Sequence, residues 1–332
     1  MPSEVLQLSP KGLRCVSGKF HLDPWRPVDI AVISHAHSDH ARFGSKLYHA
    51  TPDTAAILRK RLGEDCTIAE HPYRETFRLG NAKVSFHSAG HVLGSAQVRV
   101  EVDGKVWVFS GDYKRQSDLS CEPFEVVPCD TFITEATFAL PIYRWQSTEQ
   151  IAAQVLAWWT RERNRNRNCL IACYSLGKAQ RLIAELRRLT AWPIYTHGAV
   201  EAINEIYRRQ NRDPGATTPA MEMPAKERGA LIVCPPSALQ STWTRRFGDA
   251  ATAFASGWMQ VRGTRRREGF DQGFALSDHA DFPDLVRTVK ETGASRVLVT
   301  HGSNDAFSRY LREQGIAAEP LVVTEFSGEA EE

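Results

Sequence analysis

Three histidines and an aspartate lie within six consecutive residues, in the segment HAHSDH that runs from His35 to His40. The segment directly follows the apolar run VDIAVIS, which is typical of a buried β-strand. Imidazole nitrogens and carboxylate oxygens together are ligands that zinc and neighbouring divalent metals take in proteins. The alternative interpretation, a polar surface loop, does not explain why four such groups gather at one strand end. The pattern therefore predicts a metal site that includes His35, His37, Asp39 and His40.

A metal site that stays open to a substrate is assembled from segments far apart in the sequence, so further ligands should follow other strands. Three later apolar runs end in a polar residue beside a glycine: SAGH ends at His91, SGD ends at Asp112, and VTHG contains His301. These three residues are candidates for the same site. The remaining histidines are expected to have structural or surface roles; they are His21, His49, His71, His87 and His197.

The secondary-structure elements that must position these side chains differ between the first part of the chain and the rest. The first part of the chain consists of short strand-like runs, and two of them flank Asp103-Gly104, a dipeptide favoured in the tight turn of a β-hairpin. After residue 134, helical periodicity alternates with short apolar runs. The expected helices cover 151–159, 178–189, 282–291 and 305–314, and the expected strands are 169–173, 273–277 and 296–300.

The composition is that of an ordinary globular protein of one or two domains, with 332 residues, 42% of them hydrophobic and 24% charged. No apolar run reaches 18 residues, and the N-terminal segment lacks the pattern of a signal peptide, so we expect no membrane partner and a cytoplasmic location. The seven cysteines form no CxxC pair and are expected to be reduced thiols.

The charge is unevenly distributed along the chain. The whole chain carries only +2, but residues 146–265 contain 17 Lys and Arg against 9 Asp and Glu, a net charge of +8, and the remainder carries −6. A basic section attracts a polyanion without regard to its base sequence, because binding releases condensed counterions.

The HxHxDH element, the later His91 and Asp112, and the alternating strands and helices resemble the metallo-β-lactamase fold. Glu135 in ITEATF, His279 in LSDHADF and His301 in VTHGS resemble the further motifs of the β-CASP nucleases. Several longer runs, DPWRPVDIAVISHAHSDH and FITEATFALPIYRW among them, are similar to bacterial ligase-associated DNA exonucleases. The resemblance implies an α/β protein: an αββα sandwich built from 1–145 and 266–332, with a cap domain inserted at 146–265 that lies over the metal site and leaves a cleft.

The resemblance also implies roles for the site residues. One metal is expected on His35, His37 and His91, the other on Asp39, His40 and His301, with Asp112 bridging the two. Asp29 is similar to an aspartate that braces the HxHxDH loop, and Glu135 to a carboxylate that orients a ligating imidazole. His279 has the position of a candidate general acid. Zinc is the expected metal and manganese the alternative.

The cap section offers a second place for phosphate. In Tyr174-Ser-Leu-Gly-Lys178 a strand leads into a helix, and Ser175 and Lys178 lie at the positive end of the helix dipole. An ordinary helix cap is the alternative interpretation. The arginines between 161 and 167 are more simply a solvated face. Trp158, Trp159, Trp243 and Trp258 have the right chemistry to stack on bases, although packing in the cap core is the simpler role.

The function implied is a two-metal phosphodiesterase, a DNA exonuclease that favours the 5′ end and acts in DNA repair. Its partners would be DNA, an ATP-dependent DNA ligase and a helicase. An RNA-processing nuclease is the main alternative, because RNA-acting relatives share histidine at the position of His301. A β-lactamase or thioesterase would leave the basic insertion, Glu135 and His279 unexplained. A non-catalytic scaffold would not keep every ligand position filled. Strand polarity, cutting mode, metal identity and oligomeric state stay open.

Overall fold

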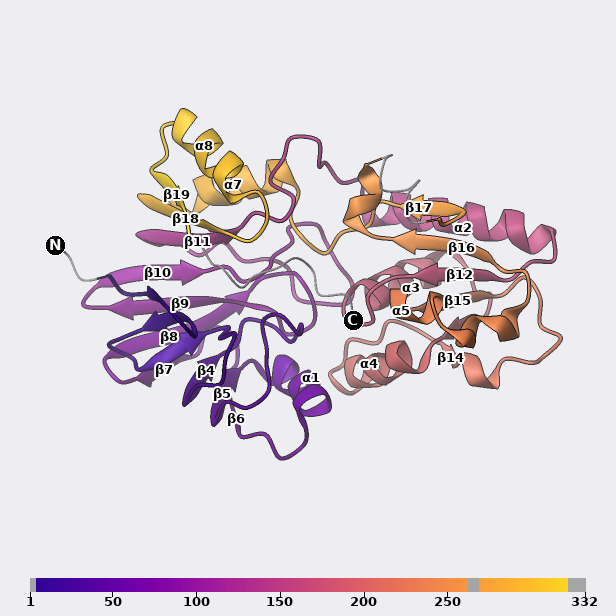
Figure 1. Ribbon diagram of the computed structural model, residues 1–332, viewed down its shortest axis with the longest axis horizontal. Coiled ribbons are helices and arrows are strands. Elements are labelled where there is room, and N and C mark those ends of the chain that lie inside the picture. The colour runs from indigo at the N-terminus through magenta and orange to yellow at the C-terminus, as the bar shows by residue number, and fades with distance from the viewer. Residues whose placement is uncertain (1–3, 262–268, 322–332) are drawn as a thin grey trace. The chain divides into compact units, whose positions relative to one another are not determined.

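The computed structural model of the chain describes residues 4–261 and 269–321. These residues divide into two compact units (Figure 1). The first unit contains 4–117, 122–144 and 279–321, and the second contains 118–121, 145–261 and 269–278. No helix among the described residues is both long enough and apolar enough to cross a membrane.

The first unit is built from two sheets and three helices. The described strands form one sheet in the order β1-β2-β3-β4-β5-β6 and another in the order β19-β18-β11-β10-β9-β8-β7. The strands are β1 (Gln7–Ser9), β2 (Gly12–Cys15), β3 (Phe20–Leu22), β4 (Ile30–Val32), β5 (Leu47–Ala50), β6 (Ile68–Glu70), β7 (Thr76–Leu79), β8 (Ala82–Ser88), β9 (Ala96–Val102), β10 (Lys105–Phe109), β11 (Thr131–Glu135), β18 (Arg296–Thr300) and β19 (Ala318–Pro320). The helices are α1 (Pro52–Leu62), α7 (Phe282–Thr292) and α8 (Asn304–Glu313).

The two sheets share one hydrophobic core, and the second sheet shares another with α7 and α8. Side chains alternate across a strand, so in β11 Ile133 packs between the sheets while Phe132 packs against the helices. β18 divides in the same way, with Leu298 in the first core and Val297 in the second. Together with α1 beside the first sheet, this is the αββα sandwich that the sequence predicts, and Figure 1 shows its layers.

The expected hairpin joins β9 and β10. Val102 pairs with Lys105 across the turn, and Asp103 and Gly104 both have positive φ, at 50° and 78°. Both central residues of a type I′ turn need this backbone conformation, which explains why Asp-Gly stands there.

The second unit is a parallel sheet flanked by helices. The described strands lie in the order β14-β13-β15-β12-β16-β17, and every pair is parallel. The strands are β12 (Cys169–Ala172), β13 (Ile194–Thr196), β14 (Thr218–Pro219), β15 (Leu231–Cys234), β16 (Ala251–Ala255) and β17 (Gln272–Phe274). The helices are α2 (Thr148–Asn164), α3 (Lys178–Leu189), α4 (Gly198–Arg209) and α5 (Pro236–Leu239), with short 3₁₀ turns at Ala220–Glu222, Thr242–Phe247 and Gly257–Gln260.

The second unit extends further along the chain than the expected cap. β17 pairs with β16, so residues up to Asp278 lie with this unit, beyond the expected boundary at 265. The run 273–277, expected as a strand of the sandwich, instead contributes to the edge of the parallel sheet. The physical reason is backbone pairing: Phe254 lies opposite Gly273, and a strand placed there satisfies an edge that would otherwise stay open.

Candidate metal centre

The candidate ligands lie at the ends of strands of both sheets in the first unit. The HAHSDH segment follows β4 of one sheet, while His91, Asp112 and His301 follow β8, β10 and β18 of the other.

The turns that carry Asp112 and His301 depend on glycine. A Cβ on Gly111, which has φ 54°, would come within 2.7 Å of the Ser34 side chain, and one on Gly302 (φ 73°) would come within 2.3 Å of the Ala136 carbonyl oxygen. Only glycine lets these loops approach so closely.

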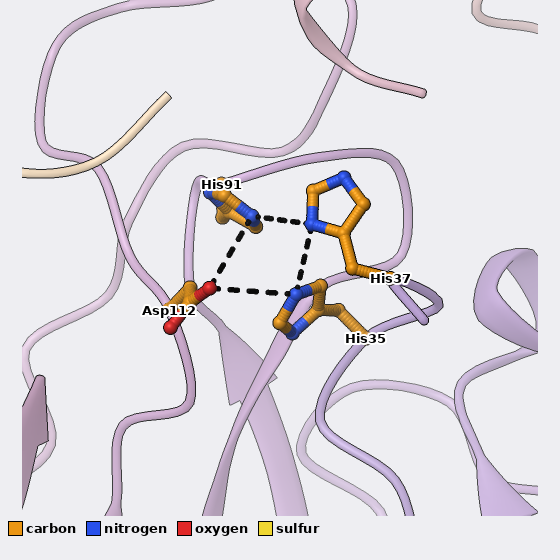
Figure 2. A group of neighbouring side chains, drawn as sticks. All are labelled: His35, His37, His91 and Asp112. Carbon is orange, nitrogen blue, oxygen red and sulfur yellow. Dashed lines mark hydrogen bonds and ion pairs between the residues drawn. The ribbon is translucent and has the colours of Figure 1, made fainter. Parts of the chain in front are cut away.

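Three histidines converge on Asp112 (Figure 2). His35 Nε2 and His91 Nε2 each lie 3.1 Å from His37 Nδ1, and they lie 3.7 and 3.9 Å from Asp112 Oδ2. The four donor atoms are all within 4.8 Å of one another. Three imidazole nitrogens and one carboxylate oxygen facing one space are a donor set that fits a divalent cation such as zinc.

The ionisation of this group suits metal binding. Burial, together with His40 and His91, holds the pKa of His35 well below its usual range, so its imidazole is in the neutral form that ligates metal. Burial by itself would raise the pKa of Asp112, but His40 and His279 hold it well below its usual range. The Asp112 carboxylate is therefore ionised.

A second group shares the same oxygen of Asp112. His40 Nε2 lies 3.3 Å from Asp112 Oδ2 and 3.6 Å from Asp39 Oδ2, and the His40 and His301 rings are 5.3 Å apart between centroids. Burial is the main reason why the pKa of His301 is lowered to about 4, and this lowered pKa favours the neutral form of the imidazole. Asp112 Oδ2 thus lies within 3.9 Å of imidazole nitrogens of both groups.

The aspartate that braces the HAHSDH loop is Asp23, and the expectation for Asp29 is wrong. Asp23 is buried; its Oδ2 lies 2.7 Å from His40 Nδ1, and its Oδ1 accepts from the Ser34 backbone N–H at 2.7 Å. The Asp29 side chain is 78% exposed and pairs with Lys46 at 2.7 Å. Asp29 stands at the outer end of β4, before the strand enters the core, whereas Asp23 lies beside the strand's inner end. The positive φ of Asp23, 38°, belongs to the turn that brings it there.

Glu135 pairs with His279 and not with one of the expected metal ligands. Both side chains are buried, and His279 Nδ1 lies 2.8 and 3.0 Å from the two Glu135 oxygens. The Tyr113 backbone N–H donates to Glu135 Oε1 at 2.8 Å, and the Tyr113 carbonyl accepts from the Ala280 N–H at 2.6 Å. The residue next to Asp112 thus holds Glu135 directly and also holds the backbone next to His279. His279 remains beside the site, with its ring 4.8 Å from that of His91.

A buried lysine next to the site was not anticipated from the sequence. Lys114 has no exposed surface, and its Nζ donates to the His91 backbone carbonyl at 3.2 Å. Its own N–H donates to the Ala89 carbonyl at 3.0 Å. These bonds join the turn that carries Asp112 to the turn that carries His91. In the sequence, Lys114 is recognisable only as a lysine two residues after the candidate ligand Asp112. That pattern is too common to indicate a role.

The structure gives Lys178 an internal role. Its side chain is 2% exposed, lies over the Tyr174 ring at 4.3 Å and is 3.9 Å from Asp278 Oδ2. The charge expected to meet a substrate phosphate is therefore buried against a carboxylate. Ser175 is also buried, and its carbonyl accepts a hydrogen bond from Gln180 Nε2 at 2.9 Å. The turn is therefore stabilised by a buried side chain of the second unit itself.

The arginines around α2 surround one buried carboxylate. Arg161, Arg165 and Arg167 lie 3.0 to 3.2 Å from the Glu162 oxygens. The Arg161 and Arg165 side chains are still 53% and 62% exposed, so they can also contact an anion in solvent. Trp158 and Trp159 are core residues, Trp243 is half-buried against His197, and Trp258 is 37% exposed. Arg262 and Arg265 lie outside the described residues.

Comparison with known proteins supports the fold and the family. No family model matches the chain. A crystal structure of a protein of unknown function from Enterococcus faecalis V583 has the same fold, with a TM-score of 0.59 at 10% identity over 89% of this chain and 79% of that one.

Three curated relatives carry enzyme or processing-factor names. A protein of Opitutus terrae named "Probable DNA ligase" is 33% identical over 303 residues, which make up 90% of this chain and 29% of that protein. An "RNase J-like protein" of Methanocaldococcus jannaschii is 26% identical over 55% of this chain and 50% of its own length. "Cleavage and polyadenylation specificity factor subunit 3" of Dictyostelium discoideum is 25% identical over 47% of this chain and 24% of its own length. The chain thus spans from about a quarter to half of these relatives.

The four-layered sandwich and the histidine–aspartate site at its strand ends define a metallo-β-lactamase fold protein. Within that superfamily, the motifs of the chain and the names of these relatives support a similarity to the β-CASP nucleases.

Proposed function

We propose that this chain is a two-metal phosphodiesterase that degrades DNA from an end, preferably the 5′ end, and that it acts in DNA repair. The observation that carries the proposal is the shared oxygen of Asp112. Asp112 Oδ2 lies 3.7 and 3.9 Å from His35 Nε2 and His91 Nε2 and 3.3 Å from His40 Nε2, so two cations held by these residues could share it. Zinc suits the imidazole-rich donor set, and manganese is the alternative metal.

The residues of the site support hydrolysis of a phosphodiester. Two cations held by these residues would supply Lewis-acid stabilisation of the attacking and leaving oxygens of an in-line displacement. In that reaction water attacks phosphorus and releases a proton to solvent, the bond from phosphorus to the leaving oxygen breaks, and the leaving oxygen takes a proton from a general acid. We assign the proton donor to His279. Glu135 holds the ring through its Nδ1 and stabilises the charged imidazolium.

The inserted unit supports a polyanionic substrate. Several of its arginine side chains are more than half exposed although each pairs with a glutamate; they include Arg161, Arg165 and Arg188. Contacts of this kind read the phosphate backbone and not the bases, which suits an enzyme that removes nucleotides one after another.

DNA is favoured as the substrate by the relative named as a DNA ligase. That similarity covers 90% of this chain at 33% identity, whereas the relatives named for RNA processing match about half of it at 25–26%. A functional association with an ATP-dependent DNA ligase and a helicase is part of the proposal. RNA is the alternative substrate, because those RNA-named relatives share the family.

The test is a comparison of matched single-stranded DNA and RNA of one base sequence, each labelled at either end, with Zn²⁺ or Mn²⁺ added to metal-depleted protein. We expect stepwise shortening of DNA from the 5′ end and poor cleavage of RNA. Asp112→Asn is the control for contaminating nuclease. Efficient cleavage of RNA with DNA left intact would replace DNA by RNA in the proposal.

A further inference from the structure

One buried side chain of the second unit contacts residues near the places where the chain enters or leaves that unit. The chain crosses between the two units at both ends of 118–121, at 144–145 and at 278–279. Arg181 of α3, which is 1% exposed, contacts a residue at or near each of these crossings. Thr148, Ser277, Asp278 and Asp118, which it contacts, belong to the second unit.

The contacts of Arg181 use the whole guanidinium group. Nη1 donates to the Ser277 carbonyl at 2.5 Å and to Asp278 Oδ1 at 3.3 Å. Nε donates to Thr148 Oγ1 at 3.0 Å, and Nη2 donates to the same hydroxyl. Nε also lies 3.8 Å from Asp118 Oδ2. The planar fork therefore binds three separate segments at once, which a single ammonium group cannot do.

The charges around Arg181 make this arrangement difficult to loosen. The Asp118 and Asp278 side chains are both 4% exposed, and Lys178 Nζ lies 3.9 Å from Asp278 Oδ2. Buried carboxylates keep their charge only while their partners stay in place, so removing one cation leaves an uncompensated charge. The cluster thus resists small displacements of Asp278.

Asp278 is followed directly by His279. On the far side of His279, the Ala280 N–H donates to the Tyr113 carbonyl at 2.6 Å, and α7 then begins at its N-cap, Asp281. The backbone on both sides of His279 is therefore held, at Ser277 by Arg181 and at Ala280 by Tyr113.

We propose that Arg181 is a positioning residue for His279. By fixing Ser277 and Asp278 it sets the path of the backbone into His279, so that the imidazole meets both Glu135 and the leaving oxygen. The role rests on the proposed phosphodiesterase function. It predicts an effect on turnover and none on the affinity for metal or for substrate, because Arg181 is 1% exposed and contacts Thr148, Ser277 and Asp278, none of which is a candidate ligand.

The test compares Arg181→Lys with Leu186→Ala. Lysine keeps the positive charge but loses the fork, whereas Leu186→Ala opens a cavity elsewhere on the same helix, where Leu186 has no exposed surface. For each variant we would measure kcat and KM on the nucleic acid that the wild type cleaves, the metal content per chain, the Tm, and the hydrogen exchange of amides 277–283. We expect Arg181→Lys to lower kcat by about 10-fold or more, with KM and metal content within about twofold, and to speed exchange in 277–283.

Leu186→Ala separates positioning from stability. It should lower the Tm at least as much as Arg181→Lys while kcat per folded molecule stays within about twofold of the wild type. Equal losses of kcat in both variants, or a wild-type kcat and exchange rate in Arg181→Lys, would overturn the proposal.

Two further results have defined meanings. If Arg181→Lys does not fold, Thr148→Val, which removes only the hydroxyl acceptor, is measured in the same way, and an unchanged kcat and exchange rate would again reject the role. If the wild type cleaves neither DNA nor RNA, the proposed function fails. Exchange in 277–283 still reports whether Arg181 holds this segment.

Discussion

His279 Nδ1 lies 2.8 Å from Glu135 Oε2, within a pair of side chains that are both buried. Glu135 ends β11 and His279 lies three residues before α7, so the contact joins positions 144 residues apart in the sequence. The pairing orients the His279 ring through its Nδ1. It also distinguishes His279 from His301, the histidine that follows the neighbouring strand β18.

His301→Ala and His279→Ala should separate metal binding from proton transfer. Loss of His301 is expected to reduce the metal content from two ions per chain towards one, because its ring stands beside His40 and Asp112. Loss of His279 is expected to leave the metal content unchanged and to lower kcat by about 10²–10⁴-fold, the usual contribution of a general acid. Elemental analysis together with steady-state kinetics checks both. A metal-depleted His279 variant beside a fully loaded His301 variant would reverse the assignment.

Glu135→Gln tests the charge of the pair separately from its shape. Glutamine has the same size and can still accept a hydrogen bond from His279 Nδ1, but it cannot stabilise the imidazolium ion. We expect kcat to fall by about 10–100-fold with an unchanged metal content, as is usual when a supporting carboxylate is lost. The measurement is kcat at saturating substrate with metal content determined on the same sample. A kcat equal to that of the wild type would show that the negative charge has no role.

Asp23→Asn should weaken metal binding, whereas Asp29→Asn should not. Asp23 orients His40 through its Nδ1, and loss of such a brace typically costs about 10–100-fold in metal affinity. Asp29 is exposed and pairs only with Lys46 among the described contacts, so it is the matched control. Competition with a chromogenic chelator gives the affinity of each variant. Similar affinities for both variants would count against Asp23 as the brace.

Folding should become less favourable as the pH falls from about 6.5 to 4, in part because of His49. Burial, and to a lesser degree His71, lowers the pKa of His49 to about 4. The folded state therefore holds His49 neutral while the unfolded state binds a proton below its ordinary pKa of 6.5. The stabilisation is complete above pH 6.5 and is lost towards pH 4, by about 1–2 kcal/mol once solvent screening is allowed for.

The measurement is the free energy of unfolding as a function of pH for the wild type and His49→Gln, both in chelator. The variant should show a shallower fall between pH 6.5 and 4, since the metal-site histidines titrate equally in both proteins. His87→Gln serves as the control, because His87 pairs with Glu125 at the edge of the sandwich. Parallel curves for the wild type and His49→Gln would refute the prediction.

Binding of single-stranded DNA to the Asp112→Asn variant should weaken steeply with salt. Each phosphate that the protein contacts contributes a slope of about −0.7 to the log–log plot of affinity against salt concentration. Replacing Arg161 and Arg165 by glutamine should make the slope less steep, because both side chains are largely exposed. Arg181→Lys should leave the slope unchanged, because that side chain is buried. A flat salt response in the parent variant would exclude a phosphate-reading surface.

The sequence by itself determined much of the fold and of the metal site. Its strand ends are local signals: an apolar run followed by histidine, aspartate and glycine marks each ligand without knowledge of the others. The hairpin at Asp103-Gly104 follows from backbone preference in the same way, whereas the αββα sandwich was implied by the resemblance to the metallo-β-lactamase fold. His35, His37, His91 and Asp112 could therefore be identified before any distance was known.

Only the tertiary structure shows which polar side chains pair with one another. Asp23 and Asp29 are both aspartates near the start of β4, and only the folded chain shows that the first reaches His40 while the second faces solvent. The sequence likewise placed Lys178 and Arg181 among the basic residues of a charged unit, but their side chains are buried against Asp278. The reason is physical: periodicity along the chain reports the pattern of burial within one element, whereas the partner of a buried charge comes from another element, and that pairing exists only after the chain has folded.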